Sequence, residues 1–217
     1  MIKAVIFDYD GTLIDTVKQI QLVGNLSLRD FSLNEVPAEK YMKFIGGGAR
    51  KLIERLVNES YKPYDELIDR VLFRYLSYYD KMQNEAMCSF DGVFEMLKKL
   101  NEQGIKVAIL SNKPDRHVKA GINAALNGVE VDYIVGSDSG FPLKPDPTSL
   151  LYVIDKLGVN LDEVLYVGDG DADVIVAKNA GVKACFVLWG YRSEEELKAV
   201  GAEDFISSPN ELFDYIK

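Results

Sequence analysis

Short hydrophobic runs recur along the chain, and each is followed by polar or glycine-containing sequence. Within a run the apolar residues do not alternate with polar ones, which is typical of strands buried on both faces of a sheet. These runs occupy residues 4–7, 107–110, 133–135, 164–167 and 184–188. Apolar residues at helical spacing fall between them, within 93–100, 150–157 and 174–178. The alternation of strand and helix from about residue 91 onward predicts an α/β fold with a doubly wound parallel sheet.

The segment 16–82 interrupts this alternation, because it is far longer than an ordinary crossover and contains no convincing strand. Its apolar residues lie at helical spacing in three stripes: Val17, Ile20, Gly24 and Leu28, then Leu52, Ile53 and Leu56, then Leu67, Ile68, Val71, Leu72, Tyr75, Leu76 and Tyr79. We therefore predict a helical unit over 16–82, inserted into an α/β core made of residues 1–15 and 83–217.

Two acids follow the first predicted strand, in Asp8-Tyr9-Asp10-Gly11-Thr12. In an extended backbone, side chains two residues apart point to the same side, so both carboxylates are expected to face one spot at the carboxyl edge of the sheet. Open α/β proteins bind their ligands at this edge. Gly11 permits a tight turn and a close approach of the backbone. Two neighbouring carboxylates resist ionising together, and a divalent cation would supply the missing positive charge.

Three later strands are also followed by polar groups. Ser111 and Asn112 come after the second strand and offer a hydroxyl and backbone N–H groups, which bind phosphate oxygens. Lys144 lies in a proline-containing loop just before a helix and can supply a point charge. Asp169 and Asp173 follow a further strand and lie one helical turn apart. Together with the first acidic pair, these groups are what a metal-assisted phosphoryl-transfer site needs.

Composition narrows the classes of partner. With 25 basic and 34 acidic residues the chain carries a formal net charge of −9, which argues against nucleic acid or an anionic membrane surface as a partner. No stretch approaches the roughly 20 apolar residues of a membrane span, and the first residues lack the apolar run of a signal peptide, so a cytoplasmic location is expected. Cys88 and Cys185 are too few for a disulfide framework, and we expect two reduced, buried thiols. A monomer or a homodimer is expected.

The order of these motifs resembles the haloacid dehalogenase superfamily, in particular its phosphatase branch with a Rossmann-like core and a helical cap inserted after the first motif. The resemblance covers essentially the whole chain. It rests on Asp8-Tyr9-Asp10-Gly11-Thr12, on Ser111, on Lys144, and on Gly168-Asp169 through Asp173. Within the superfamily, three segments are similar to phosphoglycolate phosphatases, namely Ser111-Asn112-Lys113-Pro114, Lys144-Pro145-Asp146-Pro147 and Ala177-Lys178-Asn179-Ala180-Gly181.

The resemblance implies a role for each acid. Asp8 would attack phosphorus and form an aspartyl-phosphate, while Asp10 would protonate the leaving oxygen and later activate water. The Asp8 side chain, the Asp10 backbone carbonyl and Asp169 would hold Mg²⁺, which prefers oxygen ligands. Asp173 would orient Lys144 or a metal-bound water.

The resemblance also implies how phosphate is bound. Ser111, with backbone N–H groups at Asn112 and around Gly11, would bind the transferring oxygens, and Lys144 would offset their charge. The helical unit would close over the site. Its segment Gly46-Gly47-Gly48-Ala49-Arg50 is expected over the substrate, where Arg50 could meet an anionic group.

Three cap and loop residues carry a simpler expectation. The aromatic side chains of Tyr75 and Tyr79 lie at helical spacing and are expected to serve packing. His117 is the one histidine of the chain, and a surface or capping role is expected for it. The role of Lys113, two residues after Ser111, is left open.

The function that follows is a Mg²⁺-dependent phosphatase of a small phosphorylated metabolite, with 2-phosphoglycolate as the first candidate. A β-phosphoglucomutase-type phosphotransferase and a pyrophosphatase share this chemistry and remain open. The alternative outside enzymes is a receiver-like phosphoacceptor domain, which also combines a parallel sheet, an acceptor Asp and Mg²⁺. A receiver-like domain would have no helical insertion and would carry its acceptor Asp on a later strand, and the sequence favours neither.

Overall fold

A six-stranded sheet forms the centre of the computed structural model, which describes residues 1–82 and 87–216. Its strand order is β5-β4-β1-β6-β7-β8, and all neighbours are parallel. The strands are β1 (Ala4–Phe7), β4 (Lys106–Leu110), β5 (Tyr133–Val135), β6 (Val164–Gly168), β7 (Lys183–Val187) and β8 (Phe205–Ile206). Five of them were predicted to within one residue, and the doubly wound α/β fold is confirmed. The two-residue β8 was not predicted.

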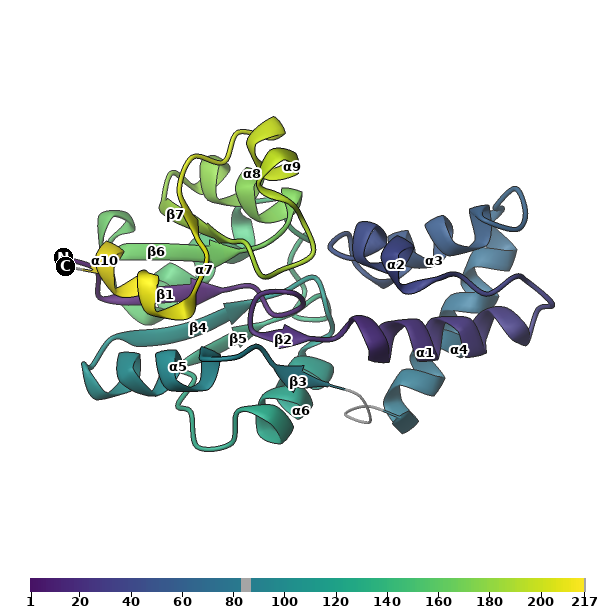
Figure 1. Cartoon of the computed structure of the whole chain (residues 1–217), viewed down its shortest axis with the longest axis horizontal. Helices are drawn as coiled ribbons and strands as arrows, with labels where there is room; N and C mark the ends of the chain where they lie inside the picture. The colour runs from purple at the N-terminus through teal and green to yellow at the C-terminus, as the bar shows by residue number, and fades with distance from the viewer. Residues whose placement is uncertain (83–86, 217) are drawn as a thin grey trace.

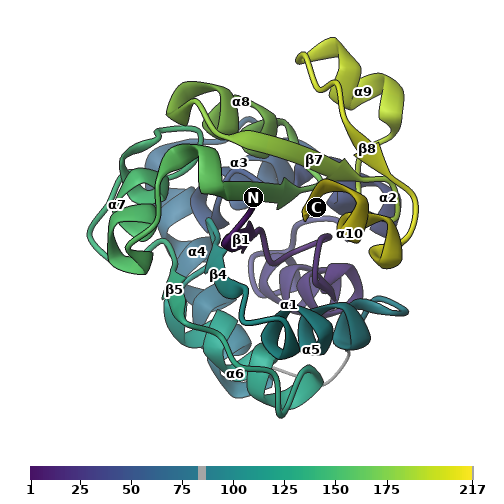
Figure 2. The same cartoon turned by 90° about the vertical axis from the view of Figure 1, so that its left-hand side faces the viewer.

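Helices cover both faces of the sheet (Figure 2). One face packs on α5 (Val93–Glu102), α6 (Asp115–Ala125) and α10 (Leu212–Ile216), and the other on α7 (Thr148–Leu157) and α8 (Asp171–Ala180). The side chains of strand β1 show why both faces of the sheet are covered. Val5 and Phe7 belong to the first core and Ala4 and Ile6 to the second, since successive side chains of a strand point to opposite faces. The short helix α9 (Glu194–Ala199) covers the end of the sheet near β7.

Four helices between β1 and α5 pack on one another and have a hydrophobic core of their own. They are α1 (Val17–Arg29), α2 (Ala38–Phe44), α3 (Ala49–Asn58) and α4 (Asp65–Met82). Figure 1 shows this helical unit to one side of the sheet. The predicted boundary at residue 83 falls in 83–86, outside the described residues, so the division into two units stays a prediction. Helix α2 was not predicted, because the three apolar stripes identified in the sequence lie outside it.

The chain passes between the sheet and the helical unit through a short antiparallel pair, β2 (Ile14–Asp15) with β3 (Cys88–Ser89). This pair corrects one expectation about the cysteines. Cys185 is buried in β7 as predicted, but Cys88 is exposed. The reason is its place in a two-residue strand that no layer of helices covers. Among the described residues, no helix is long and apolar enough to cross a membrane.

Tyr9, between the two acids of the first motif, is fully buried against α6. Its hydroxyl lies over Gly121, where a methyl group on the helix would overlap the oxygen. We expect Gly121→Ala to lower the free energy of unfolding by about 1–3 kcal/mol through overpacking. This loss opposes the gain of about 1 kcal/mol that alanine brings over glycine in a helix.

Urea denaturation measures this effect. The exposed Asn123→Ala on the same helix is the matched control and should leave the stability unchanged or slightly higher. A Gly121→Ala variant as stable as the control would show that the close contact with Tyr9 does not affect the free energy of unfolding.

Candidate active site

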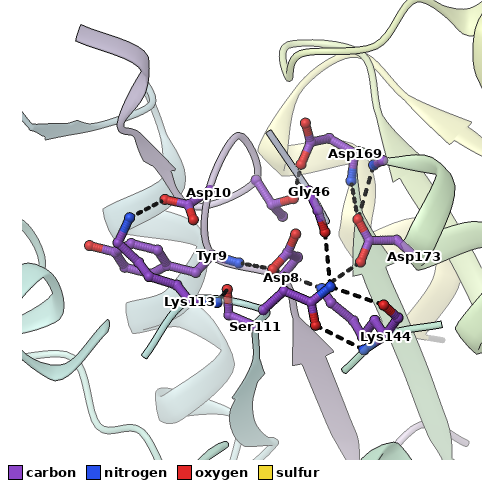
Figure 3. A network of polar contacts seen from close by, with 12 residues as sticks. Asp8, Tyr9, Asp10, Gly46, Ser111, Lys113, Lys144, Asp169 and Asp173 are labelled. Atoms are coloured by element: carbon purple, nitrogen blue, oxygen red, sulfur yellow. Dashed lines mark hydrogen bonds and ion pairs between the residues drawn. The ribbon is translucent and has the colours of Figure 1, made fainter. Parts of the chain in front are cut away.

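Four strand or helix ends bring the sequence-predicted groups together at the carboxyl edge of the sheet (Figure 3). Parallel register places Phe7 of β1 beside Ile109 of β4 and Val167 of β6, so the residues that follow these strands lie close together. Lys144 precedes α7 and meets them there. The side chains of five of these residues are buried: Asp8, Ser111, Lys144, Asp169 and Asp173.

Three of the acids form a tight cluster. Asp8, Asp169 and Asp173 each offer a carboxylate oxygen, and these oxygens lie within 4.8 Å of one another. Burial raises the pKa of Asp8 well above its ordinary range, and the negative charges of Asp173 and Asp169 add to this. Burial and the charge of Asp173 raise the pKa of Asp169 to about 7. Carboxylates in this state are short of positive charge, and a hard divalent cation with oxygen ligands fits the donor set.

Lys144 supplies the one ammonium within hydrogen-bond distance of this cluster among the described residues. Its Nζ lies 2.9 Å from Asp8 Oδ1 and 2.7 Å from Asp173 Oδ1. Burial alone would lower the pKa of Lys144, but the charges of Asp173 and Asp8 outweigh it and the pKa is raised. Lys144 therefore remains charged. The Tyr166 hydroxyl also donates to Asp173 Oδ1 at 2.7 Å.

The second oxygen of Asp173 is held by the backbone. The N–H groups of Gly170 and Asp169 donate to Asp173 Oδ2 at 2.9 and 3.3 Å, so this carboxylate caps the start of α8. With Oδ1 on Lys144 and Oδ2 on the backbone, Asp173 holds the lysine toward Asp8. This geometry agrees with the orienting role that the resemblance implies.

Gly11 has no side chain, which allows Asp169 and Tyr191 to lie close to its backbone. Its φ of +85° suits glycine, and a Cβ there would overlap Asp169 Oδ2 and the ring of Tyr191. The close backbone approach expected of Gly11 is present. However, its N–H donates to the Ile14 carbonyl at 3.0 Å, so this group is already used within the turn.

Asn112 acts through its side chain as well as its backbone. Its amide accepts from Lys144 N at 2.8 Å and donates to the Lys144 carbonyl at 3.0 Å. The same amide donates to the Gly46 carbonyl of the helical unit at 2.9 Å. Asn112 thereby fixes the loop that carries Lys144 and connects it to the segment above the site.

The carboxylate of Asp10 departs from the expectation. It is not part of the acid cluster, and its Oδ1 instead accepts from Lys113 Nζ at 2.9 Å and from Thr16 Oγ1 at 2.6 Å. The reason is that the extended strand ends at Phe7, so the two-residue periodicity does not continue to Asp10. Both Asp8 and Asp10 nevertheless line the same pocket.

Lys113 lines the pocket, although the sequence analysis left it without a role. Its side chain is only 6% exposed and pairs with Asp10. Its Nζ lies 4.5 Å from the centre of the Tyr79 ring and 5.6 Å from that of Tyr9. Burial lowers the pKa of Lys113, but Asp10 more than offsets this and the pKa is raised, so the ammonium is retained. The sequence signals were its position, two residues after Ser111, and its place in Ser111-Asn112-Lys113-Pro114, one of the segments similar to phosphoglycolate phosphatases.

A pocket lies between the sheet edge and the helical unit. The sheet side contributes polar groups and one proline: Asp8, Asp10, Ser111, Asn112, Lys113, Pro114 and His117. The helical side contributes apolar residues and glycine: Ile20, Ile45, Gly46, Gly48, Ala49, Leu52, Tyr75, Leu76 and Tyr79. The glycine segment predicted over the substrate thus lines the pocket. Tyr75 and Tyr79 are buried in the core of the helical unit, as expected, and also face the pocket.

Arg50 does not reach this pocket, which corrects the expectation that it meets an anionic group there. Its guanidinium forms ion pairs with Asp65 and Asp69 of α4 and with Glu54 of α3. Helix α3 begins at Ala49, and its turn directs Ala49 and Leu52 to the pocket while Arg50 faces the acids of α4.

His117 is also placed differently from the expectation of a surface or capping role. It is buried in α6 and lines the pocket. Its Nε2 lies 2.6 Å from Asp80 Oδ1 of α4, and its ring centre lies 4.5 Å from that of Tyr79. The packing of α4 against α6 buries it, and residues 37 positions apart make the contact.

The family model for haloacid dehalogenase-like hydrolases matches residues 5–187. The chain belongs to this family. It is therefore an enzyme, a hydrolase, and the receiver-like phosphoacceptor alternative is set aside.

Relatives and solved structures agree with this assignment. A phosphoglycolate phosphatase of Aquifex aeolicus is 33% identical over 191 residues, which cover 87% of this chain and 86% of the relative. A phosphoglycolate phosphatase of Mannheimia succiniciproducens is 32% identical and covers 87% of each chain. A crystal structure described as a predicted phosphatase from Clostridium acetobutylicum superposes with a TM-score of 0.87 at 27% identity, covering 100% of this chain and 98% of that one.

The environment of His117 has a measurable consequence. Burial lowers its pKa, the positive charges of Lys113 and Arg116 lower it further, and Asp80 opposes them. We expect the single histidine to titrate with a midpoint below its ordinary value of 6.5. The Asp80→Asn variant should titrate lower still, because it removes a carboxylate that favours the charged imidazole.

Proton NMR of the histidine ring over pH 4–8 measures both midpoints, with the urea-unfolded chain as reference. Because the folded protein favours the neutral histidine, His117 contributes to the free energy of unfolding above pH 6.5. This contribution is lost as the pH falls toward the lowered pKa of the folded state. A midpoint above 6.5 in the folded protein would contradict the placement of His117.

Proposed function

We propose that this hydrolase releases inorganic phosphate from a small phosphate monoester, with 2-phosphoglycolate as the expected substrate. In class it is a phosphoric monoester hydrolase. The names of its relatives support the substrate. One observation carries the reaction: the buried Asp8 carboxylate lies at the pocket floor, with Ser111 on one side and Lys144 with the acid cluster on the other (Figure 3).

Asp8 is arranged to act as the nucleophile. Within the described part of the chain, both hydrogen-bond donors to its carboxylate, Lys144 Nζ and Tyr9 N, contact Oδ1. No described residue donates a hydrogen bond to the second oxygen, Oδ2, that would reduce its nucleophilicity. It attacks phosphorus, the bond between phosphorus and the ester oxygen breaks, and an aspartyl-phosphate forms.

Asp10 handles the proton in both steps. It gives a proton to the leaving ester oxygen, and afterwards takes one from the water that attacks the aspartyl-phosphate. The products are the alcohol, inorganic phosphate and the regenerated Asp8. Thr16 and Lys113 hold Asp10 Oδ1 in place at the pocket wall.

The transferring phosphoryl group needs positive charge and donors. Ser111 offers its hydroxyl, Asn112 its backbone N–H, and Lys144 its charge through the contact with Asp8. Asp8, Asp169 and the Asp10 backbone carbonyl would hold Mg²⁺, beside Asp173. When bound, this ion would neutralise phosphate oxygens and relieve the repulsion among the acids.

The helical unit, proposed to span 16–82, serves as a cap that excludes bulk water. Several contacts join it to the sheet side. Arg192, in the loop after β7, donates to the carbonyls of Met42, Lys43 and Ile45 at the end of α2. Asn112 donates to Gly46, and His117 contacts Asp80.

The remaining circumstances of the enzyme are proposed from its composition. A net charge of −9 supports small phosphorylated molecules as partners, without nucleic acid or membrane. We further propose that it works in the cytoplasm as a monomer or homodimer.

We expect Asp8→Asn to lower phosphate release from 2-phosphoglycolate by ~10³-fold or more, because an amide does not form the aspartyl-phosphate. A panel of phosphate esters with Mg²⁺ and a phosphate assay measures this. The exposed Asp155→Asn makes the same change away from the site and should keep full activity. Circular dichroism confirms that both variants fold.

Retained activity in Asp8→Asn would refute the nucleophile. For the wild type, isomerisation of a sugar phosphate without phosphate release would indicate the β-phosphoglucomutase-type transferase. Release from pyrophosphate but from no ester would indicate the pyrophosphatase.

Arg192 gives a test of the cap. Its side chain is 12% exposed, so the hydrogen bonds it makes to α2 are shielded from water. We expect Arg192→Met to lower kcat/KM by about tenfold, since a hydrogen bond from a charged donor contributes about 1.5–3 kcal/mol. Arg29→Met, which removes an exposed ion pair to Glu35 within the helical unit, should change kcat/KM less than about twofold. Equal kcat/KM in both variants would count against Arg192 as a contact that holds the cap.

A further inference from the structure

The charges of the pocket wall are unevenly distributed. Every residue that the helical unit contributes is apolar or glycine, apart from the two tyrosine hydroxyls. Arg50, the cation expected on that side, is bound to the acids of α4 instead. Within the described lining, the one side chain with a permanent positive charge is Lys113, on the sheet side.

Lys113 has hydrogen-bonding capacity that the protein does not use. An ammonium has three N–H donors. Among the described residues, its one hydrogen-bond acceptor is Asp10 Oδ1, at 2.9 Å. The rings of Tyr79 and Tyr9 flank the ammonium, and the side chain is 6% exposed. A buried cation with one acceptor, facing a cavity, is a site for a second anion.

The position of this cation relates it to the leaving group. In the proposed reaction Asp10 gives its proton to the ester oxygen of the substrate. Lys113 touches the same carboxylate, and Figure 3 shows it on the side of Asp10 away from Lys144 and the acid cluster. The ammonium therefore lies beside the alcohol portion of the ester. Lys144 is not available for this purpose, because Asp8 and Asp173 occupy it.

We infer that Lys113 binds a carboxylate on the alcohol portion of the substrate, so that the enzyme selects phosphate esters of small 2-hydroxy acids. In such an ester one carbon separates the ester oxygen from the carboxylate, which matches an ammonium placed directly next to the general acid. The inference rests on the proposed function and deepens it, since it names the residue that recognises the substrate class.

The charges of the site are consistent with this substrate. With Asp10 protonated, as the first step of the proposed reaction requires, Asp8, Asp169 and Asp173 carry three negative charges against the two positive charges of Lys113 and Lys144. A bound divalent cation would bring the sum to +1. Lys113 supplies its positive charge beside Asp10, on the side where the carboxylate must enter.

A competing role for Lys113 is to position Asp10 only. The two roles differ in their effect on substrates. A residue that only positions the general acid affects every ester by the same factor, whereas a residue that binds the carboxylate affects only esters that carry one.

The test compares 2-phosphoglycolate with 2-hydroxyethyl phosphate, in which a neutral CH₂OH replaces the carboxylate. The measured quantity is the ratio of kcat/KM for the first ester to kcat/KM for the second. We expect a wild-type ratio above ~10, and a fall of at least about tenfold in Lys113→Met, whose side chain has similar length and no charge. Lys113→Arg keeps the positive charge and should keep the ratio within about threefold of wild type.

The outcomes are separable. Phosphate release from no ester by the wild type would refute the proposed function. Release with a wild-type ratio near one, or with the same ratio in Lys113→Met as in the wild type, would overturn the inference and leave the phosphatase standing. The wild-type ratio and Lys113→Arg keep the test decisive if Lys113→Met does not fold.

Discussion

Repulsion among three buried carboxylates is the constraint around which this molecule is arranged. Asp8, Asp169 and Asp173 cannot separate, because Asp8 and Asp169 directly follow adjacent, fully buried strands and Asp173 lies in the first turn of the helix after them. The surrounding groups limit the electrostatic cost. Lys144 lies against two of the acids, and Thr12 and the Tyr191 N–H donate to the third, Asp169, each at 2.8 Å. Part of the negative charge remains uncompensated. This charge would attract a cation, and the cation would in turn attract phosphate.

The strand ends show how far sequence can predict such a site. Hydrophobic runs without alternation identify buried parallel strands, and parallel strands bring their carboxyl ends to one edge. That rule suffices to place Asp8, Ser111 and Asp169 near one another. It failed for the side chain of Asp10, since periodicity applies only while the backbone stays extended, and β1 ends at Phe7.

Contacts between elements far apart in the sequence were beyond prediction. His117 is buried because α4 packs on α6, and nothing local to residue 117 encodes that contact. Arg50 follows the register of α3, which a one-residue change in the start of the helix would reverse. Lys113 resembles any surface lysine until Tyr79 and Tyr9 cover it. In each case the sequence showed the residue type, whereas the orientation of the side chain depended on packing between elements.

The β2–β3 pair has a consequence for how this architecture can change. Ile14 lies opposite Ser89 and Asp15 opposite Cys88, so the chain leaves the sheet and returns to it at hydrogen-bonded neighbours. The distance that an intervening segment must bridge is therefore the width of one strand pair, whatever its length. Segments of quite different size and shape can occupy this position without altering the register of β1. The pocket wall that the helices contribute can thus change while the acids of the sheet edge stay fixed.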